Sequence, residues 1–218
     1  MLELVFVIVA IGILAITIIP RAQNDLLQEA AFQLVGHIRY TQHLAMVDDK
    51  FDPTDQFWYR TRWQIFFANG AGTNNRWSYT IFSDTAGMHT GNPDPIEVAV
   101  NPLNPSKRLT GGANGAAIIH TNDAAATREM NLGEKYDIQN INFSASCING
   151  QSQRIAFDHL GRPMRGAFQN YNTPYPANGL ITAMCVITLT DSSGGNAMVA
   201  IAPETGYACI WDGAQCIM

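Results

Sequence analysis

The segment MLELVFVIVAIGILAITIIPR, residues 1–21, decides how the rest of the chain is interpreted. From Leu4 to Ile19 it contains no charged residue, and a helix that is apolar on every side must be buried on every side. A membrane-spanning helix needs about 20 apolar residues, within a range of roughly 17–25. The segment is therefore slightly short for a membrane anchor, and it carries an acid at its start, Glu3, and a proline at its end, Pro20.

The remaining residues form a mildly acidic chain. The 218 residues are enough for one globular domain with an appendage. Beyond the first 20 residues there are 13 basic residues against 17 acidic ones, hence a net charge of −4. Such a surface disfavours non-specific electrostatic binding of nucleic acid.

The four cysteines fall in the last third of the chain: Cys147, Cys185, Cys209 and Cys216. No pair has the CxxC spacing of a zinc or redox site, and no histidine follows at a ligand distance. Because a membrane segment precedes them, two disulfides in an oxidising compartment are favoured over a metal site. Three connectivities are possible, and we favour Cys209 with Cys216 and Cys147 with Cys185.

Helical periodicity continues beyond Pro20. The apolar positions recur at spacings of three, four or seven: Leu27, Ala31, Leu34, Ile38 and Ala45. The polar positions occupy the other sides: Asp25, Gln28, Glu29, Gln33, Arg39 and Gln42. The pattern predicts one helix from about Leu2 to Val47, whose first half lies in lipid and whose second half packs on a domain. A proline near the lipid boundary can kink such a helix.

From Phe57 onward the pattern is typical of strands. In FWYRTRWQIFF, alternate residues face one side: Phe57, Tyr59, Thr61, Trp63, Ile65 and Phe67. The turn-rich NGAGTNN connects this run to RWSYTIFSD and predicts a hairpin. Further strands are expected in IEVAV, AAIIHT, YDIQNINFSA, QRIAFDHLG, LITAMCVITLT and AMVAIAPETG. Short, regularly punctuated strands predict an antiparallel sheet or sandwich.

The expected fold class is therefore α+β, with a long N-terminal helix packed on an antiparallel sheet or sandwich domain. Residues 1–47 form the helix, of which 1–20 are the transmembrane and assembly part and 21–47 are amphipathic. Residues 48–56 form a linker, and residues 57–218 form the β-rich globular domain.

The N-terminal pattern resembles a known protein family. LEL, the apolar run, GILA and the Ile-Pro boundary resemble the first segment of type IV pilins and type II secretion pseudopilins. Glu3, Gly12 and Pro20 have the mutual spacing of that segment. RIAFDHLGRP, followed by a strand pair ending in VAIAPETGY, is similar to minor pseudopilins of the H type and to FimT-like proteins. The resemblance covers about 45 residues well and the remainder weakly.

This resemblance implies a pilin-like subunit of the bacterial inner membrane, with a single span and a periplasmic domain, that is extracted into a short filament. It implies as partners the other pilins or pseudopilins, the inner-membrane assembly machinery, secreted cargo, and a prepilin peptidase that cuts a leader and methylates the new N-terminus. Family precursors place the acid two positions further along than Glu3, so the numbered sequence is expected to start two residues inside the mature protein.

The resemblance assigns assembly to Glu3, Gly12 and Pro20. An acid within the membrane costs about 2.5–3.5 kcal/mol, which makes it a functional candidate. Glu3 is expected to pair with a neighbouring subunit's amine and set the axial register; alternatively it reaches the headgroups and favours the helix dipole. Gly12 either permits close helix approach or is simply tolerated. Pro20 is either a hinge or only a kink.

An anchored hydrolase is a competing hypothesis, so we considered four histidines as its possible residues: His37, His43, His120 and His159. The first two are six residues apart and lie on different sides of the helix. The other two stand beside Asp123 and Asp158 and are better interpreted as loop histidines beside turn acids. GxSxG, HExxH and phosphate-loop motifs are absent, and DSSGG is typical of a hairpin turn. No catalytic residue, metal or cofactor is expected.

DNA capture is the alternative function, because FimT-like proteins include DNA-binding members of competence pili with a C-terminal Gly-Arg-x-Arg motif. The nearest counterpart is Gly161-Arg162-Pro163-Met164-Arg165, which lies earlier in the chain and is spaced differently. Arg162 and Arg165 on an acidic domain would contact few phosphates, so a turn between strands is favoured and DNA is disfavoured as a partner. The sequence thus favours a structural minor pseudopilin or minor pilin over an enzyme.

Overall fold

The computed structural model describes residues 2–86, 89–113 and 118–217; within residues 2–25 it describes the helical backbone and the side chains of residues 5, 7–9 and 11. The first element, α1, spans Leu2–Val47. It matches the single helix that the sequence predicts and continues through Pro20 without interruption. A short helix, α2, covers Leu132–Tyr136.

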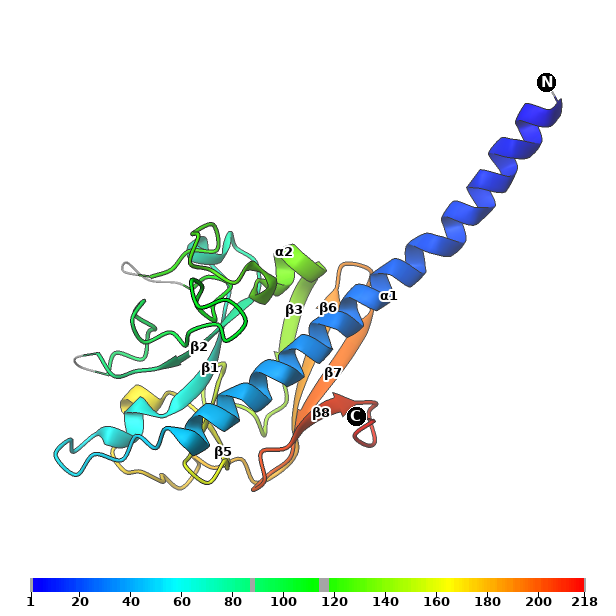
Figure 1. The fold of residues 1–218 in the computed structure, drawn as a ribbon. Coiled ribbons are helices and arrows are strands. Elements are labelled where there is room, and N and C mark those ends of the chain that lie inside the picture. The colour runs from blue at the N-terminus through cyan, green and yellow to red at the C-terminus, as the bar shows by residue number, and fades with distance from the viewer. Residues whose placement is uncertain (1, 87–88, 114–117, 218) are drawn as a thin grey trace.

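Two antiparallel four-stranded sheets form the rest of the core (Figure 1). The first sheet has the order β2-β1-β4-β5 and contains β1 (Trp63–Ala68), β2 (Ser78–Ser83), β4 (Arg154–Phe157) and β5 (Pro163–Arg165). The second has the order β3-β6-β7-β8 and contains β3 (Ile138–Phe143), β6 (Cys185–Asp191), β7 (Asn196–Ile201) and β8 (Ala208–Trp211). Four short 3-10 helices, η1 to η4, cover Trp58–Thr61, Ala71–Thr73, Arg128–Met130 and Phe168–Asn170.

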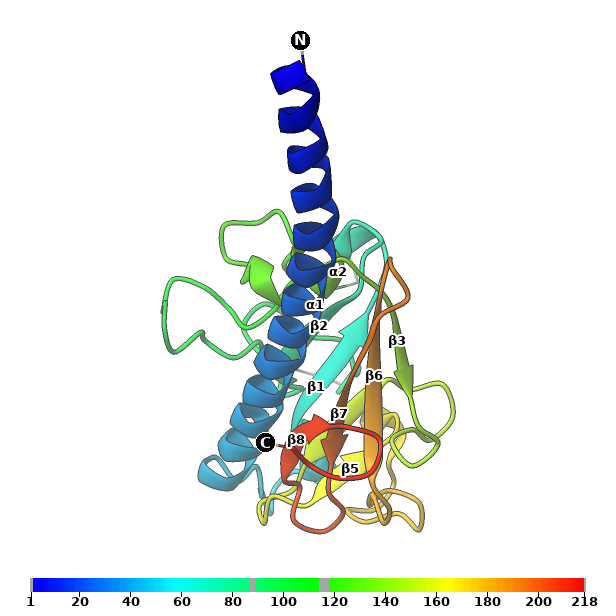
Figure 2. The ribbon, with the colours of Figure 1, turned by 90° about the vertical axis from the view of Figure 1, so that its right-hand side faces the viewer.

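The C-terminal half of α1 packs across both sheets, contacting β1 and β4 of one and β6, β7 and β8 of the other (Figure 2). The five apolar positions that the periodicity assigns to the packed side are all buried: Leu27, Ala31, Leu34, Ile38 and Ala45. They meet inward-facing residues of both sheets in a single cluster, including Ile65 of β1 and Ile187 of β6. The amphipathic half of the helix is thus one layer of the domain core.

The two sheets differ in how they are covered. Along β6 buried and partly exposed residues alternate, as expected for a strand with one face on the core. In β2 and β4 every residue is buried. The outer face of the first sheet is covered by a second apolar cluster that includes Tyr59, Met164 and Phe168.

One of the expected strands is shorter than predicted, and another is not formed. The strand expected from Phe57 begins only at Trp63, because residues Trp58–Thr61 form η1. Local hydrogen bonds favour this turn over an extended chain: the Thr61 hydroxyl donates to the Trp58 carbonyl at 2.6 Å. IEVAV forms only isolated bridges, such as Val98 with Phe82, so it follows the edge of β2 without becoming a strand.

Other strand predictions have mixed outcomes. Of AAIIHT, residues 116 and 117 lie outside the described residues, and residues 118–121 are not in a strand. The β1–β2 hairpin and the strands β3, β4, β6 and β7 form where the sequence predicts them. Two short strands, β5 and β8, were not predicted; each pairs with a neighbour that precedes it closely in sequence.

Replacing Leu34 by alanine should lower the free energy of unfolding by about 2–5 kcal/mol, because its side chain is fully buried and its removal leaves a cavity. Phe32 lies two residues away on the same helix with 46% of its surface exposed, so Phe32→Ala should cost about 0.5 kcal/mol. Urea unfolding of the full chain in mild detergent, followed by tryptophan fluorescence, measures both. Similar losses in the two variants would contradict this packing.

Candidate assembly interface

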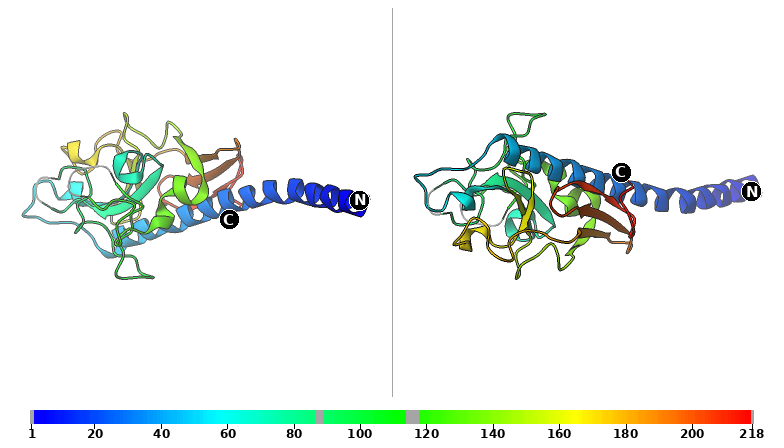
Figure 3. Two further views of the ribbon diagram at one scale, coloured as in Figure 1. Left: turned by 90° about the horizontal axis from the view of Figure 1, so that it is seen from above. Right: turned by 90° about the horizontal axis from the view of Figure 1, so that it is seen from below.

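The N-terminal half of α1 extends beyond the sheets and away from the domain (Figure 3). Each of its described side chains is apolar and more than half exposed: Val5, Val7, Ile8, Val9 and Ile11, at 53–61%. Three of them are consecutive, and consecutive residues of a helix point in different directions. The exposure is therefore not confined to one side.

The residues assigned to assembly lie on this part of the helix. Glu3, Gly12 and Pro20 are all within α1, and at these three positions only the helical backbone is described. At a rise of 1.5 Å per residue, Glu3 and Pro20 are separated by about 25 Å along the axis. Across the described residues, none of the helices combines the length and apolar character that a bilayer crossing demands.

Polar side chains fasten the other half of α1 to loops of the domain. Arg39 donates from Nε and Nη2 to the carbonyl oxygen of Ala208, at 3.0 and 2.8 Å. Gln42 donates from Nε2 to the carbonyls of Gly161 and Thr205, at 2.8 and 2.7 Å. These contacts attach the helix to the start of β8 and to the β4–β5 and β7–β8 connections.

The β7–β8 connection depends on a glycine. Gly206 has a φ of +65°, and a Cβ there would lie 2.3 Å from the Gly161 carbonyl oxygen and 2.5 Å from Gln42 Nε2. Only glycine adopts this left-handed conformation without cost and leaves room for the two neighbours. The glycine thereby allows two loops to reach one glutamine of α1.

A buried polar network joins α1 to the first sheet and to α2. Gln33 Nε2 donates to the hydroxyl oxygen of Tyr79 at 2.7 Å, and Gln33 Oε1 accepts from the Tyr136 hydroxyl at 2.7 Å. His37 Nδ1 lies 2.6 Å from the Tyr79 hydroxyl oxygen. Since Gln33 donates to that oxygen, the phenol proton is left for His37, whose Nδ1 then accepts it.

Burial controls protonation within this network. It lowers the pKa of His37 from 6.5 to about 4, which keeps the imidazole neutral and its Nδ1 an acceptor. It also raises the pKa of Tyr79 far above the ordinary tyrosine value, despite the hydrogen bond from Gln33. The pKa of Tyr136 rises to about 12, by burial and by the nearby Glu29 carboxylate. At neutral pH the network is therefore uncharged.

Tyr79 and Tyr136 were not singled out from the sequence. Alternation along RWSYTIFSD places Tyr79 on the same side as Ile81, in the core. A buried tyrosine needs a partner for its hydroxyl. That requirement was the available signal, but it does not reveal that the partners are Gln33 and His37 on a distant helix.

A cavity of about 610 Å³ lies beside this network, between α1 and the loop after IEVAV. Its lining includes His37 and Tyr40 of α1 together with Pro102, Leu103 and Lys107. Leu103 is 94% exposed. The cavity is mainly apolar and open to solvent, and among the described residues no group of three His, Cys, Asp or Glu side chains could hold a metal ion there or elsewhere.

The two arginines considered for DNA contact are engaged within the domain. Arg162 forms an ion pair with the fully buried Asp158 carboxylate, at 2.8 Å. Arg165 donates from Nη1 to the carbonyls of Ala145 and Ser146, both at 2.9 Å. The Gly161–Arg162 segment is the turn that connects β4 with β5, as the turn interpretation predicts.

The histidine and acid pairs show no catalytic geometry. Asp123 accepts a hydrogen bond from the backbone N–H of His120, and Asp158 is occupied by Arg162. His37 is buried against Tyr79, whereas His43 is exposed on another side of α1. DSSGG is the turn between β6 and β7, as expected.

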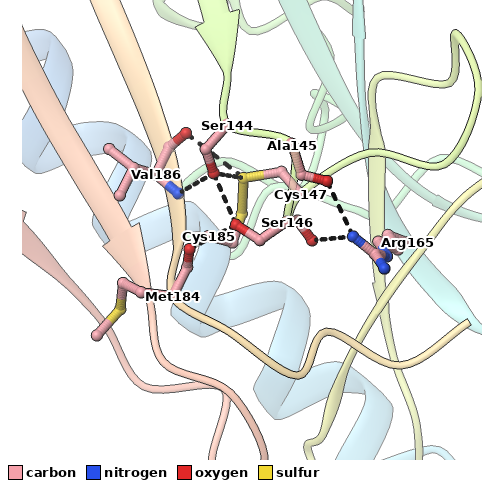
Figure 4. The surroundings of a disulfide bond; sticks show 8 residues. All are labelled: Ser144, Ala145, Ser146, Cys147, Arg165, Met184, Cys185 and Val186. Carbon is pink, nitrogen blue, oxygen red and sulfur yellow. Dashed lines mark hydrogen bonds between the residues drawn. A yellow bond between two sulfur atoms is a disulfide. The ribbon is translucent and has the colours of Figure 1, made fainter. Parts of the chain in front are cut away.

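Both predicted disulfides are formed. Cys147 is bonded to Cys185, with the Cα atoms 4.7 Å apart, and Cys209 to Cys216, with the Cα atoms 5.6 Å apart. The first links the segment after β3 to the start of β6 in the buried core, and Figure 4 shows Arg165 bound to the neighbouring carbonyls. Side-chain contacts and covalent bonds thus fix the same segment.

Comparison with known proteins gives no match: no protein family model, no curated protein and no solved structure matches this chain.

The stability of the folded chain should fall as the pH decreases from 6.5 to 4. Between these pH values His37 is protonated in the unfolded chain but stays neutral in the folded chain, because its pKa is lowered there. Each pKa unit is worth about 1.4 kcal/mol, so the loss is on the order of 3 kcal/mol. Urea midpoints across this range should show a flatter profile for His37→Gln, whereas His43→Gln, on the same helix but exposed, should follow the parent chain. Parallel profiles for all three proteins would refute the buried neutral histidine.

Proposed function

We propose that this chain is an assembly subunit of a type II secretion pseudopilus or a type IV pilus, a minor pseudopilin or minor pilin rather than an enzyme. The N-terminal half of α1 would anchor it in the inner membrane and later insert into the filament. The observation that carries the proposal is the contrast within one helix: from Leu27 onward one side of α1 is buried in the domain core, while the described side chains of residues 5–11 are exposed and apolar.

The exposed half requires an apolar environment from outside the chain. Burying a valine or isoleucine side chain completely is worth about 1.5–3 kcal/mol. Val7, Ile8 and Val9 point in different directions, so a single groove on one partner would leave some of them in water. Lipid and a bundle of neighbouring helices both surround a helix completely. Either environment would therefore cover this half of α1, first as a membrane anchor and later in the core of a filament.

Glu3 would control the register of this assembly. A carboxylate in an apolar environment is stabilised when it meets an opposite charge, and the N-terminal amine of a neighbouring subunit would supply one. Matching the two groups fixes the axial position, whereas apolar packing alone tolerates sliding. In this proposal Gly12 allows close helix contact and Pro20 marks the boundary between the buried and the exposed parts of the assembled helix.

The globular domain would present contacts to other subunits, the assembly machinery or cargo. Its part of α1 keeps Phe32, Met46 and Val47 exposed at 46%, 54% and 63%. Because α1 is bonded to both sheets, a force on its N-terminal half is transmitted directly to the domain. Extraction of the helix from the membrane would therefore move the domain with it.

A DNA-binding role is not favoured by any contact that the structure describes. The Arg162 guanidinium is paired with Asp158, and Arg165 binds carbonyl oxygens of a neighbouring loop. Recruiting them to phosphates would break those interactions, and few contacts give weak, salt-sensitive binding.

Replacing Glu3 by alanine or glutamine should reduce incorporation into filaments at least about tenfold, because loss of a desolvated ion pair costs several kcal/mol and about 1.4 kcal/mol corresponds to tenfold. Quantifying sheared filaments and secreted protein in cells that express each variant measures the effect. Glu29→Gln, which removes an exposed acid of the same helix, is the matched control and should assemble normally. Normal filaments and export with Glu3→Ala would sink the assembly role.

The system in which the subunit works can be identified separately. Deleting the gene and scoring secreted proteins, surface pili and DNA uptake side by side distinguishes a secretion pseudopilus from an adhesive or competence pilus. Loss of none of the three would contradict the proposal as a whole.

A further inference from the structure

A second hollow lies far from the exposed half of α1, at the ends of β1 and β4. Its volume is about 610 Å³, within the range of ligand sites. It is lined by residues 66–69, 149–154, 167, 169 and 170, all of which follow α1 in the chain. It adjoins another hollow of about 420 Å³, with which it shares Asn149, Ala167 and Asn170. The two form one elongated groove, here called the amide groove.

The floor of the amide groove contains a buried cation without an ion pair. Arg154 is 7% exposed, and its guanidinium carbon lies 4.2 Å from the centre of the Phe66 ring. Its side-chain hydrogen bond to Gln64 Oε1 is long, at 3.4 Å. Burial lowers the pKa of Arg154 to about 10, partly offset by the charge of Asp84, so the group remains cationic at neutral pH. The described part of the chain brings no carboxylate within ion-pair distance of it.

Further polar atoms around this arginine lack partners. Gln64 Nε2, Ser152 Oγ and Gln169 Oε1 are buried and have no hydrogen-bond partner within the described structure. Gln64 is the residue that accepts from Arg154, while Ser152 and Gln169 line the groove. Buried polar groups in folded proteins are nearly always paired with protein, water or ligand, so these atoms and the Arg154 charge together offer hydrogen-bonding capacity to a polar, anionic ligand.

We propose that the amide groove binds an acidic, extended peptide segment of a partner protein. A carboxylate of the peptide pairs with Arg154, for which a guanidinium offers a planar set of donors. Side-chain amides along the groove supply both donors and acceptors and therefore suit peptide groups. Those amides are Asn149, Gln151, Gln153, Gln169, Asn170, Asn172 and Asn178.

Other ligand classes fit less well. Nucleic acid requires several cations, and Arg154 is the charged residue among those that line either hollow. The face of the Phe66 ring that meets Arg154 is already occupied by the guanidinium, so a base or a sugar could not stack there. A small free acid would fill only the position beside Arg154 and leave the second hollow unused. The length of the combined groove therefore favours an extended peptide over a small acid.

The groove wall that begins at Asn149 is held in place before any ligand arrives. Two residues earlier, Cys147 is bonded to Cys185, and Arg165 binds the carbonyls of Ala145 and Ser146 (Figure 4). A wall that is already ordered lowers the entropic cost of binding. Arg165 is therefore a positioning residue for the groove. The proposal is independent of the assembly role, since the groove does not involve α1.

The test uses the full chain in detergent micelles and two capped peptides, acetyl-Asn-Gly-Glu-Gly-Asn-amide and the same peptide with glutamine in place of glutamate. Amide chemical shifts of Gly150 and Gln153 report binding at the groove. The glutamate peptide should bind saturably and at least about tenfold more tightly than its glutamine counterpart. Equal affinity, or no saturable binding at about 1 mM peptide, would overturn the proposal.

Variants separate the parts of the site. Arg154→Gln should abolish the preference for glutamate. Because this residue is buried, Gln169→Ala provides a second variant at the groove surface, which should weaken the glutamate peptide several-fold. Arg165→Gln should weaken both peptides alike and leave their ratio unchanged, as expected of a positioning residue. Arg128→Gln, an exposed arginine outside the groove, should change nothing.

Acetate distinguishes a peptide site from a site for free carboxylates. If acetate displaces the glutamate peptide at concentrations equal to those of the peptide itself, the groove recognises the carboxylate alone and the peptide proposal falls. Displacement only at much higher concentration supports recognition of the surrounding chain.

Discussion

Leu34 and Ile38 lie fully buried where α1 crosses the two sheets, and the position of the rest of the helix follows from this contact. A helix is stiff over several turns, so fixing one half in a core fixes the direction of the other half. The exposed half therefore projects from the domain in a fixed direction instead of moving as a flexible tail. In the proposed assembly role this is an advantage, because less orientational freedom would remain to be lost when the helix enters a bundle.

Polar contacts surround that apolar contact and make it specific. Arg39 and Gln42 each bind carbonyl oxygens of particular loops, and Gln33 matches the hydroxyls of two tyrosines. Sliding the helix by one residue would leave apolar surface roughly matched but would break these hydrogen bonds and leave buried partners, such as the Tyr79 hydroxyl, unpaired, which is costly. Hydrophobic burial thus supplies most of the attachment energy, while hydrogen bonds select one register. His37 accepts the hydrogen bond from Tyr79 only when its imidazole is neutral, so the attachment of α1 to the domain depends on pH.

The sequence predicted best what a local pattern determines. The extent of α1, its buried positions and the β1–β2 hairpin follow from periodicity and turn residues, and the two disulfides are the pairing that we favoured among three possible connectivities. It failed where long-range contacts compete with a local preference. IEVAV has the composition of a strand and lies along the edge of β2, yet it forms isolated bridges instead of a continuous ladder, and Trp58–Thr61 forms a 3-10 turn although its residues alternate. The amide groove joins three distant segments around Arg154, and no spacing in the chain indicates that they meet.

The first sheet explains why such a groove forms beside β4. Its inner face packs on α1, and on its outer face Met164 of β5 packs with Tyr59 of η1 and Phe168 of η4. On that outer face, β4 and β1 place Arg154 opposite Phe66 and Ala156 opposite Gln64. The apolar cover includes Ala156 but not Arg154, whose guanidinium has a long hydrogen bond to Gln64 Oε1 at 3.4 Å, while Gln64 Nε2 has no partner among the described residues. Apolar residues at both positions would have closed this face more cheaply. Their replacement by a guanidinium and an amide is unfavourable for folding alone, and it becomes favourable once a carboxylate from another chain occupies the groove.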